Sequence, residues 1–190
     1  MTAQNQTVLV VDDDRQLADL YAAWLREDYD VRTAYGGRKA IEVMSEEIDV
    51  ALVDRLMPRI SGEAVLKHVR ASEYDCRVSI VTAVDPGFDI IEMGFDEYMT
   101  KPIEREEIET VVSSLVTRAE YDEKLQDLFA LASKRAALET KKSTYELEKS
   151  DAYAELTAEF ERLKCDLERT AADLSDRAFE AEMRRMGVGG

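Results

Sequence analysis

Short apolar runs alternate with amphipathic stretches over the first 117 residues, and this alternation restricts the fold more than any other feature of the sequence. A strand that is buried on both faces is apolar throughout, whereas a surface helix repeats its apolar residues every three or four positions. Apolar runs predict five strands, at residues 8–11, 31–34, 50–53, 78–81 and 98–100. Helical spacing predicts helices between them, including residues 16–25, 39–44 and 64–69. We therefore expect an α/β fold with helices on both faces of a doubly wound, five-stranded parallel sheet.

From about residue 119 the strand-like runs disappear, and Ala, Glu, Lys, Arg and Leu dominate through residue 186. Two apolar stripes have helical spacing. They consist of Tyr121, Leu125, Leu128 and Ala132, and of Leu156, Phe160, Leu163 and Leu167. Between them Ser143 and Glu146 match the S-x-x-E capping box, and Ser150 can cap a later helix start. We predict a first domain at residues 1–117 and a small all-α module at residues 118–190 that forms a helical hairpin or coiled coil. The alternative is one long, broken helix that pairs only with another chain.

The sequence is strongly acidic, with 41 Asp and Glu against 25 Lys and Arg, and a net charge of -16. Such a charge repels nucleic acid and anionic lipid, and the combination of few lysines with surplus carboxylates resembles proteins of salt-loving archaea. No stretch approaches the roughly 18 uninterrupted apolar residues of a membrane-spanning helix, so we expect a cytoplasmic protein without a membrane partner. Cys76 and Cys165 lack the spacing of a disulfide framework or of a zinc site.

Polar residues stand where the predicted strands end. They are Asp12, Asp13 and Asp14 after the first strand, Asp54 after the third, Thr82 after the fourth and Lys101 after the fifth. The carboxyl ends of parallel strands meet at one edge of a sheet, so we expect these side chains to converge. Carboxylates about 4 Å apart repel by about 4 kcal/mol at an effective dielectric of 20, and a cation keeps them ionised. Mg²⁺ is the expected cofactor, because it binds phosphate oxygens together with one or two carboxylates. The residues therefore predict a phosphoryl-transfer site.

Four segments in this order resemble the receiver-domain signature of two-component response regulators. They are Val10-Val11-Asp12-Asp13-Asp14, Asp54-Arg55-Leu56-Met57-Pro58-Arg59-Ile60-Ser61-Gly62, Thr82-Ala83 and Lys101-Pro102. The D-x-x-M-P-x-x-x-G string is specific, and the match covers about residues 6 to 117. The resemblance implies a flavodoxin-like sheet with the strand order 2-1-3-4-5. It also implies a cis Lys101-Pro102 peptide bond and a sensor histidine kinase as partner.

The resemblance also implies a role for each site residue. Asp54 would be the phosphoacceptor, and Thr82 and Lys101 would contact the phosphoryl group. Thr82 and Tyr98 would act as switch residues that report phosphorylation. Four groups would bind Mg²⁺: Asp12 through water, Asp13 and Asp54 directly, and Leu56 through its backbone carbonyl.

Two details shape what the family pattern implies for this chain. Only 19 positions separate Thr82 from Lys101, fewer than in many receivers, so we expect the fourth helix to lose a turn. In relatives that helix helps to form the dimer face used on activation, so that dimer is not carried over to this chain. Leu56 and Val84 would flank the water path to the aspartyl phosphate. Apolar side chains at both positions imply slow self-dephosphorylation.

The helical tail resembles the HalX module that follows receivers in haloarchaea, on the strength of the runs at residues 121–138 and 153–163. Residues 118–190 hold 13 Lys and Arg against 17 Asp and Glu, a net charge of -4, and show no helix-turn-helix spacing. Direct DNA binding is therefore not favoured, although regulation of transcription stays open. A homodimer or a partner complex through the apolar stripes is the simpler interpretation.

We expect a phosphoacceptor signalling protein that catalyses only its own phosphoryl transfer and slow dephosphorylation, and not a conventional enzyme. Haloacid-dehalogenase-like phosphatases also use an Asp nucleophile and Mg²⁺. Their nucleophile belongs to a D-x-D-x-T/V string. The segment Asp12-Asp13-Asp14-Arg15-Gln16 does not match it, because Gln16 stands where the string requires Thr or Val. A purely structural coiled-coil adaptor would use neither an Asp nucleophile nor Mg²⁺. The remaining alternative is a receiver-bearing adaptor whose tail dimerises or binds a partner without contacting DNA.

Overall fold

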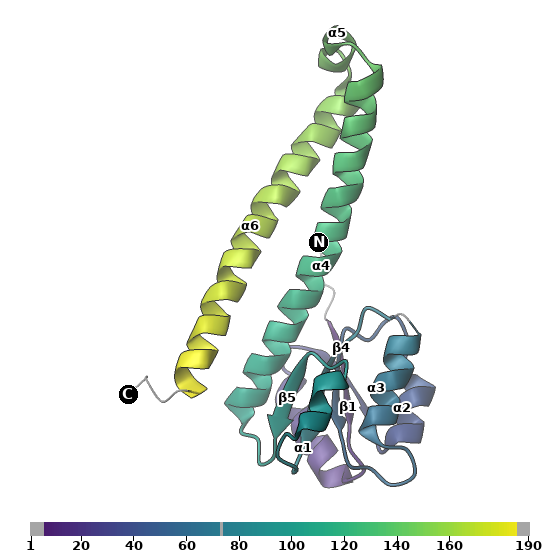
Figure 1. Cartoon of the computed structure of the whole chain (residues 1–190), viewed down its shortest axis with the longest axis vertical. Helices are drawn as coiled ribbons and strands as arrows, with labels where there is room; N and C mark the ends of the chain where they lie inside the picture. The colour runs from purple at the N-terminus through teal and green to yellow at the C-terminus, as the bar shows by residue number, and fades with distance from the viewer. Residues whose placement is uncertain (1–5, 73, 186–190) are drawn as a thin grey trace. The chain divides into compact units, whose positions relative to one another are not determined.

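In the computed structural model, which describes residues 6–72 and 74–185, five parallel strands form one sheet (Figure 1). They are β1 (Thr7–Val11), β2 (Asp30–Ala34), β3 (Val50–Asp54), β4 (Arg77–Thr82) and β5 (Glu97–Thr100). The strand order is β2-β1-β3-β4-β5, and each neighbouring pair is parallel. The predicted fold class, the predicted order and all five predicted strands are confirmed.

The helices lie between the strands and after the last of them. They are α1 (Arg15–Leu25), α2 (Gly37–Val43), α3 (Gly62–Ala71), the 3₁₀ helix η1 (Phe88–Glu92), α4 (Arg105–Lys141), α5 (Thr144–Glu148) and α6 (Asp151–Arg185). The three helices predicted in the first 117 residues are confirmed as α1, α2 and α3. None of the described helices combines the length and the apolar composition needed to cross a bilayer.

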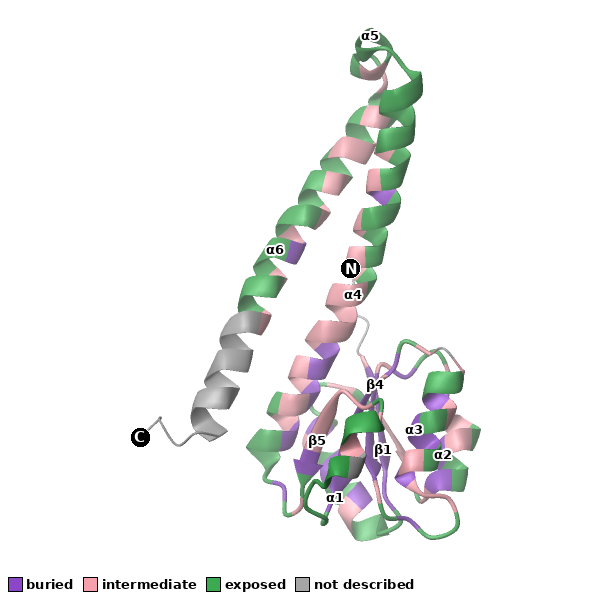
Figure 2. Ribbon diagram, viewed as in Figure 1, coloured by how far each residue is buried: buried purple, intermediate pink, exposed green. Residues whose placement is uncertain are grey.

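The apolar core has two parts, one on each face of the sheet, because successive side chains along a strand point to opposite faces. On one face Val8 and Val10 of β1 pack with α1 and with Ile108 of α4. On the other face Leu9 and Val11 pack with α2 and α3. Figure 2 shows the buried residues concentrated in the sheet and on the inner sides of these helices. Coverage of both faces explains why the inner strands are apolar along their whole length.

The connection between β4 and β5 contains only η1, a 3₁₀ helix of five residues. The expected shortening of the fourth helix is therefore confirmed. Phe88 and Ile91 of η1 are largely exposed, so this short helix adds little to the core. Among the described strands, β5 pairs with β4 alone and forms one edge of the sheet.

The chain divides into two compact units between Ala119 and Glu120, and α4 is continuous across this point. In the second unit, α5 separates the end of α4 from the start of α6. The helix break that the capping box predicted is confirmed. The Ser143 side chain accepts a hydrogen bond from the Glu146 N–H, and the Glu146 carboxylate accepts one from the Ser143 N–H.

Within the second unit, α6 runs antiparallel to the end of α4 and forms a hairpin with it. The Arg135 guanidinium of α4 lies 4.5 Å from the centre of the Phe160 ring of α6. Nearer the turn, the Tyr153 hydroxyl donates to the Glu139 carboxylate at 2.7 Å. Leu131 of α4 is buried. The contact nearer the turn joins residues 139 and 153, and the contact farther from it joins residues 135 and 160. Because the partners come closer in sequence toward the turn, the two helices run antiparallel.

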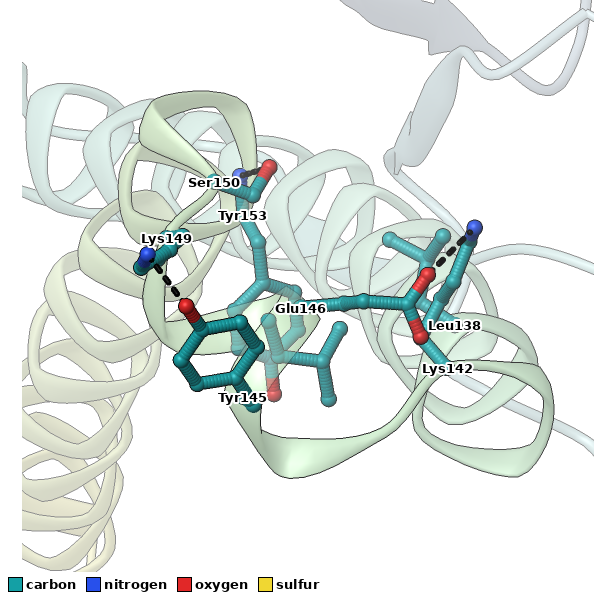
Figure 3. A pocket seen from close by; sticks show the side chains of 8 residues that line it. Leu138, Lys142, Tyr145, Glu146, Lys149, Ser150 and Tyr153 are labelled. Carbon is teal, nitrogen blue, oxygen red and sulfur yellow. Dashed lines mark hydrogen bonds and ion pairs between the residues drawn. The ribbon is translucent and has the colours of Figure 1, made fainter.

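A shallow pocket of about 420 Å³ lies at the turn of the hairpin (Figure 3). Leu138 and Tyr153 supply part of its wall. The Lys142 ammonium is 3.1 Å from the Glu146 carboxylate, and the Lys149 ammonium lies over the Tyr145 ring at 4.3 Å. The charged side chains that line the pocket thus contact other lining residues, and these contacts stabilise the turn.

The carboxyl group of Glu146 should titrate far below an ordinary glutamate. Hydrogen bonds from the Ser143 N–H, the Lys142 ammonium and the Ser143 hydroxyl lower the pKa of Glu146 to about 2. Because the folded pKa lies below the unfolded one, the cap stabilises the tail above the unfolded pKa, and this contribution disappears as pH falls through about 2. An NMR pH titration measures the midpoint. Ser143→Ala should raise it, whereas Ser133→Ala should not, and an ordinary wild-type midpoint would contradict the prediction.

Arg59, in the loop between β3 and α3, has a φ of 70°, a left-handed conformation in which a side chain is strained. This conformation costs a residue with a Cβ atom about 1–2 kcal/mol, and glycine adopts it freely at an entropic cost of about 0.5–1 kcal/mol. Arg59→Gly should therefore stabilise the protein by up to about 1 kcal/mol in urea unfolding. Arg59→Ala retains the Cβ and should give no such gain. A loss of stability in Arg59→Gly would show that the arginine side chain compensates for its backbone.

Candidate functional site

The carboxyl ends of β1 and β3 bring three carboxylates together. Asp12 follows β1 and is 2% exposed, while Asp54 ends β3 and is 7% exposed. Asp13 is exposed at the rim, and one oxygen from each of the three carboxylates lies within 4.8 Å of the others. Asp14, the last acid of the run, caps α1 instead, since its side chain accepts hydrogen bonds from the Gln16 and Leu17 N–H groups.

Lys101 reaches this cluster from the end of β5. Its ammonium donates to Asp12 Oδ2 at 2.7 Å and lies 3.3 Å from Asp54 Oδ2. Its own N–H donates to the Thr82 carbonyl at 2.7 Å, which ties its backbone to β4. The Lys101-Pro102 peptide bond is cis, as the family resemblance implied. The structure thus places side chains from three separate strand ends around one point.

Three carboxylates stand against one ammonium in this cluster, so Lys101 alone does not neutralise it. Burial raises the pKa of Asp54 above its ordinary value, Lys101 lowers it, and the neighbouring Asp12 raises it again. Burial on its own would lower the pKa of Lys101, but the hydrogen bond and charge of Asp12, followed by Asp54, raise it overall. The carboxylate oxygens are the ligand type that a hard divalent cation prefers. Asp12, Asp13 and Asp54 therefore fit a Mg²⁺ ion, which would supply the missing positive charge.

Thr82 and Tyr98, the two expected switch residues, are connected through Val84. Thr82 is fully buried, and its hydroxyl oxygen accepts a hydrogen bond from the Val84 N–H at 3.2 Å. The Tyr98 hydroxyl donates to the Val84 carbonyl at 2.9 Å. The Tyr98 ring also packs against Phe95, with 5.6 Å between ring centres. The backbone of one residue, Val84, thus links the Thr82 and Tyr98 side chains.

The loop after Asp54 turns back closely on its own start. Gly62 N–H donates to the Arg55 carbonyl at 3.0 Å, and a Cβ atom on Gly62 would collide with the Asp54 carbonyl. Only glycine permits this approach. The Leu56 N–H lies 3.4 Å from Asp54 Oδ1, and the Leu56 side chain is exposed. The Val84 side chain is also partly exposed.

Sequence reasoning missed two features of this site. It gave Asp14 no role, although Asp14 caps α1; an aspartate directly before a helical stripe was the available signal. It also missed Val84 as the backbone link between Thr82 and Tyr98, for which no sequence signal exists, since any residue has a carbonyl and nearly any has an N–H.

Family models match both parts of the chain. Residues 8–113 match the response regulator receiver domain, and residues 117–183 match the HalX domain. A putative transcriptional regulator of Haloferax volcanii is 44% identical over 137 residues, which cover 72% of this chain and 24% of that protein. The alkaline phosphatase synthesis transcriptional regulatory protein PhoP of Bacillus subtilis is 34% identical, over 61% of this chain and 50% of its own length. The chain thus spans between a quarter and a half of these relatives.

Solved receiver domains share the fold of the first unit. The receiver domain of the Francisella response regulator 1452 is 31% identical, with a TM-score of 0.54 over 60% of this chain and 98% of its own. The signal receiver domain of a putative LuxO repressor protein from Vibrio parahaemolyticus is 28% identical, with a TM-score of 0.58 over 66% of this chain and 97% of its own. These neighbours agree with the fold of the first unit. The chain belongs to the response regulator receiver family, with a HalX domain following its receiver domain.

Proposed function

We propose that this chain is a cytoplasmic response regulator in which Asp54 accepts a phosphoryl group from a sensor histidine kinase. The observation that carries the proposal is the cluster of Asp12, Asp13 and Asp54 beside Lys101 at the carboxyl edge of the sheet. A buried carboxylate next to a cation-binding pair of acids is suited to attack on phosphorus, because its charge and that of the phosphoryl group are both balanced.

The transfer forms a bond from an Asp54 carboxylate oxygen to phosphorus as the phosphorus–nitrogen bond of phosphohistidine breaks. The leaving imidazole nitrogen keeps the electron pair and takes up a proton. Asp12, Asp13, Asp54 and the Leu56 carbonyl would hold Mg²⁺, which neutralises charge on the transferring oxygens. The Lys101 ammonium, 3.3 Å from Asp54 Oδ2, is placed to pair with the charge of about -1.5 to -2 that phosphorylation adds.

The same contacts support a route for the signal. The Thr82 hydroxyl uses its oxygen to accept from Val84, so its hydrogen can donate to a phosphoryl oxygen. Movement of Thr82 toward that oxygen would release the Val84 N–H. Because Tyr98 holds the carbonyl of the same residue, the change would pass to β5.

The proposed output is self-association of the helical tail. After the hairpin has formed, Phe129 of α4 remains 65% exposed and marks the face of the tail that we assign to this contact. A second copy of the chain is the proposed occupant of this face. The name of the Haloferax volcanii relative supports a role in regulating transcription. The tail's net charge of -4 favours a protein contact over direct contact with DNA.

Acetyl phosphate with Mg²⁺ should label the wild-type chain stoichiometrically, and Asp54→Asn should abolish the label because the nucleophilic oxygen is lost. Chelation of Mg²⁺ with EDTA should also prevent labelling. Intact-protein mass spectrometry measures the result. Asp14→Asn is the matched control, because asparagine caps a helix as well as aspartate does and should leave labelling intact. Labelling that survives in Asp54→Asn, or rapid turnover of p-nitrophenyl phosphate, would refute the assignment.

Phosphorylated Asp54 should lose its label slowly, because the Leu56 and Val84 side chains shield the aspartyl phosphate from attacking water. Replacement of either residue by a polar side chain, as in Leu56→Asn or Val84→Asn, should speed the loss. Time courses of intact mass in Mg²⁺ buffer measure the rate. A wild-type half-life of only seconds would contradict this interpretation.

Phosphorylation should increase the mass of the particle in solution from that of one chain to that of two, as measured by size exclusion with light scattering. Phe129→Ser should abolish the change without affecting labelling, since Phe129 belongs to the second unit. Ser133→Ala, on the same helix, serves as the control. An unchanged mass after full labelling would exclude self-association as the output.

A further inference from the structure

The strand β5 determines where Lys101 and Tyr98 lie, and it is the shortest of the described strands. It has four residues, lies at an edge and pairs only with β4 among the described strands. A shift of one residue along β4 would turn Tyr98 to the other face and move Lys101 by about 3.3 Å. Lys101 lies 2.7 Å from Asp12, so such a shift would break this contact.

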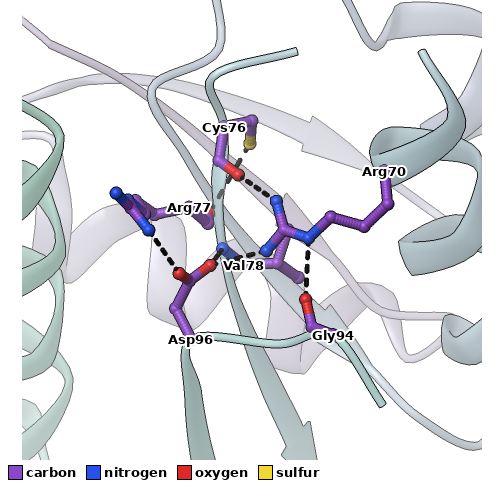
Figure 4. Close-up of polar contacts among 6 residues, drawn as sticks. All are labelled: Arg70, Cys76, Arg77, Val78, Gly94 and Asp96. Carbon is purple, nitrogen blue, oxygen red and sulfur yellow. Dashed lines mark hydrogen bonds and ion pairs between the residues drawn. The ribbon is translucent and has the colours of Figure 1, made fainter. Parts of the chain in front are cut away.

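A group of three charged side chains, which we call the β5 clamp, surrounds the start of this strand (Figure 4). Asp96, the residue before β5, accepts the Val78 N–H of β4 at 2.7 Å through its side chain. The same carboxylate is 2.8 Å from the Arg77 guanidinium and 2.7 Å from the Arg70 guanidinium. The Asp96 N–H donates to the Val78 carbonyl at 2.8 Å. The Asp96 carboxylate therefore accepts the Val78 N–H in place of a backbone carbonyl, and the β4–β5 ladder is extended by one residue.

Arg70 extends the clamp beyond the strand. From α3, its guanidinium donates to the Gly94 carbonyl at 2.7 Å and to the Cys76 carbonyl at 2.8 Å, in addition to Asp96. Gly94 lies between η1 and β5, and Cys76 directly precedes β4. One planar side chain thus connects the entry of β4, the entry of β5 and α3. The fixed fork of an arginine suits such a three-way contact, which a lysine cannot reproduce.

The clamp is partly shielded from water, since the Asp96 side chain is 14% exposed. Burial alone would raise the pKa of Asp96, but the Val78 N–H, Arg77 and Arg70 lower it overall. Asp96 is therefore charged at neutral pH and pairs fully with both arginines. The contacts are stronger than those of an exposed surface pair of the same length.

We propose that Arg70, Arg77 and Asp96 are positioning residues, which hold β5 in register and thereby place Lys101 beside Asp12 and Asp54 for phosphoryl acceptance. This inference rests on the proposed function of Asp54. The shortened connection gives the clamp its place, because Phe88 and Ile91 of η1 are largely exposed and do not anchor the start of β5. The described contacts of Asp96 and Arg70 go to each other, to Arg77 and to the backbone of Val78, Gly94 and Cys76, so the proposed action runs through the strand.

The test compares labelling rates in acetyl phosphate with Mg²⁺. Asp96→Ala in the full chain is expected to slow labelling about tenfold, because a displaced charge loses much of its effect on the transfer. Its Mg²⁺ affinity, measured by isothermal titration calorimetry, should not change, since Asp12, Asp13 and Asp54 stand on β1 and β3. In a Lys101→Ala background, Asp96→Ala should slow labelling no further, because the residue through which it acts is gone.

Two additional variants guard against simple loss of folding. Arg70→Lys keeps the charge and the Asp96–Val78 bond but loses the fork, and should slow labelling less than Asp96→Ala. Glu47→Ala removes the Arg32–Glu47 ion pair at the opposite edge of the sheet and should leave the rate unchanged. Amide hydrogen exchange should show faster exchange at Tyr98 and Lys101 in Asp96→Ala but not in Glu47→Ala.

The outcomes separate the two proposals. A wild-type chain that takes up no label refutes the role of Asp54, and the exchange rates at Tyr98 and Lys101 still decide whether the clamp holds β5. A folded Asp96→Ala with wild-type labelling and wild-type exchange overturns the clamp. An equal slowing with and without Lys101 shows that Asp96 acts by another route and also overturns it.

Discussion

The site depends on holding mutually repelling carboxylates together at one edge of a sheet that is packed on both faces. Asp12 and Asp54 are nearly buried, and their repulsion is opposed by the Lys101 ammonium and by hydrogen bonds from backbone N–H groups. Burial keeps the pKa of Asp54 raised in spite of this ammonium. The arrangement is stable only because β1 and β3 are central strands with a packed core on both faces. The same imbalance of charge is what makes the site receptive to a divalent cation.

The three contributors to the site differ in how firmly they are held. Asp12 and Asp54 stand on strands with neighbours on both sides, whereas Lys101 follows an edge strand of four residues. The central strands are anchored by apolar packing, which needs no specific partner. The edge strand is anchored by directional contacts of Asp96 with Val78 and with two arginines. The acidic centre thus stands where packed central strands end, whereas the proposed clamp adds polar contacts at the start of β5.

Much of the fold could be read from the sequence because burial on both faces leaves an unmistakable run of apolar residues. The helix break in the tail was equally accessible, since the reciprocal bonds of Ser143 and Glu146 are local. The site was predictable as a set, because each member follows a strand. The separate roles of Asp12 and Asp13 were not readable from the residues alone and came from the family resemblance, whereas the position of Asp14 before a helical stripe was a local signal for a cap. The clamp was also beyond reach, because Arg70 and Asp96 are common surface residue types far apart in the chain.

The sequence by itself determined the class of fold, the strand ends that carry chemistry and the helical nature of the tail, because each follows from local periodicity or from topology shared by all parallel sheets. Only the tertiary structure decided which carboxylates meet, that Val84 joins Thr82 to Tyr98, and that a side chain completes the ladder of β5. These features depend on distances between residues that are remote along the chain. Such distances are set by the packing of the two core faces, which no local pattern encodes.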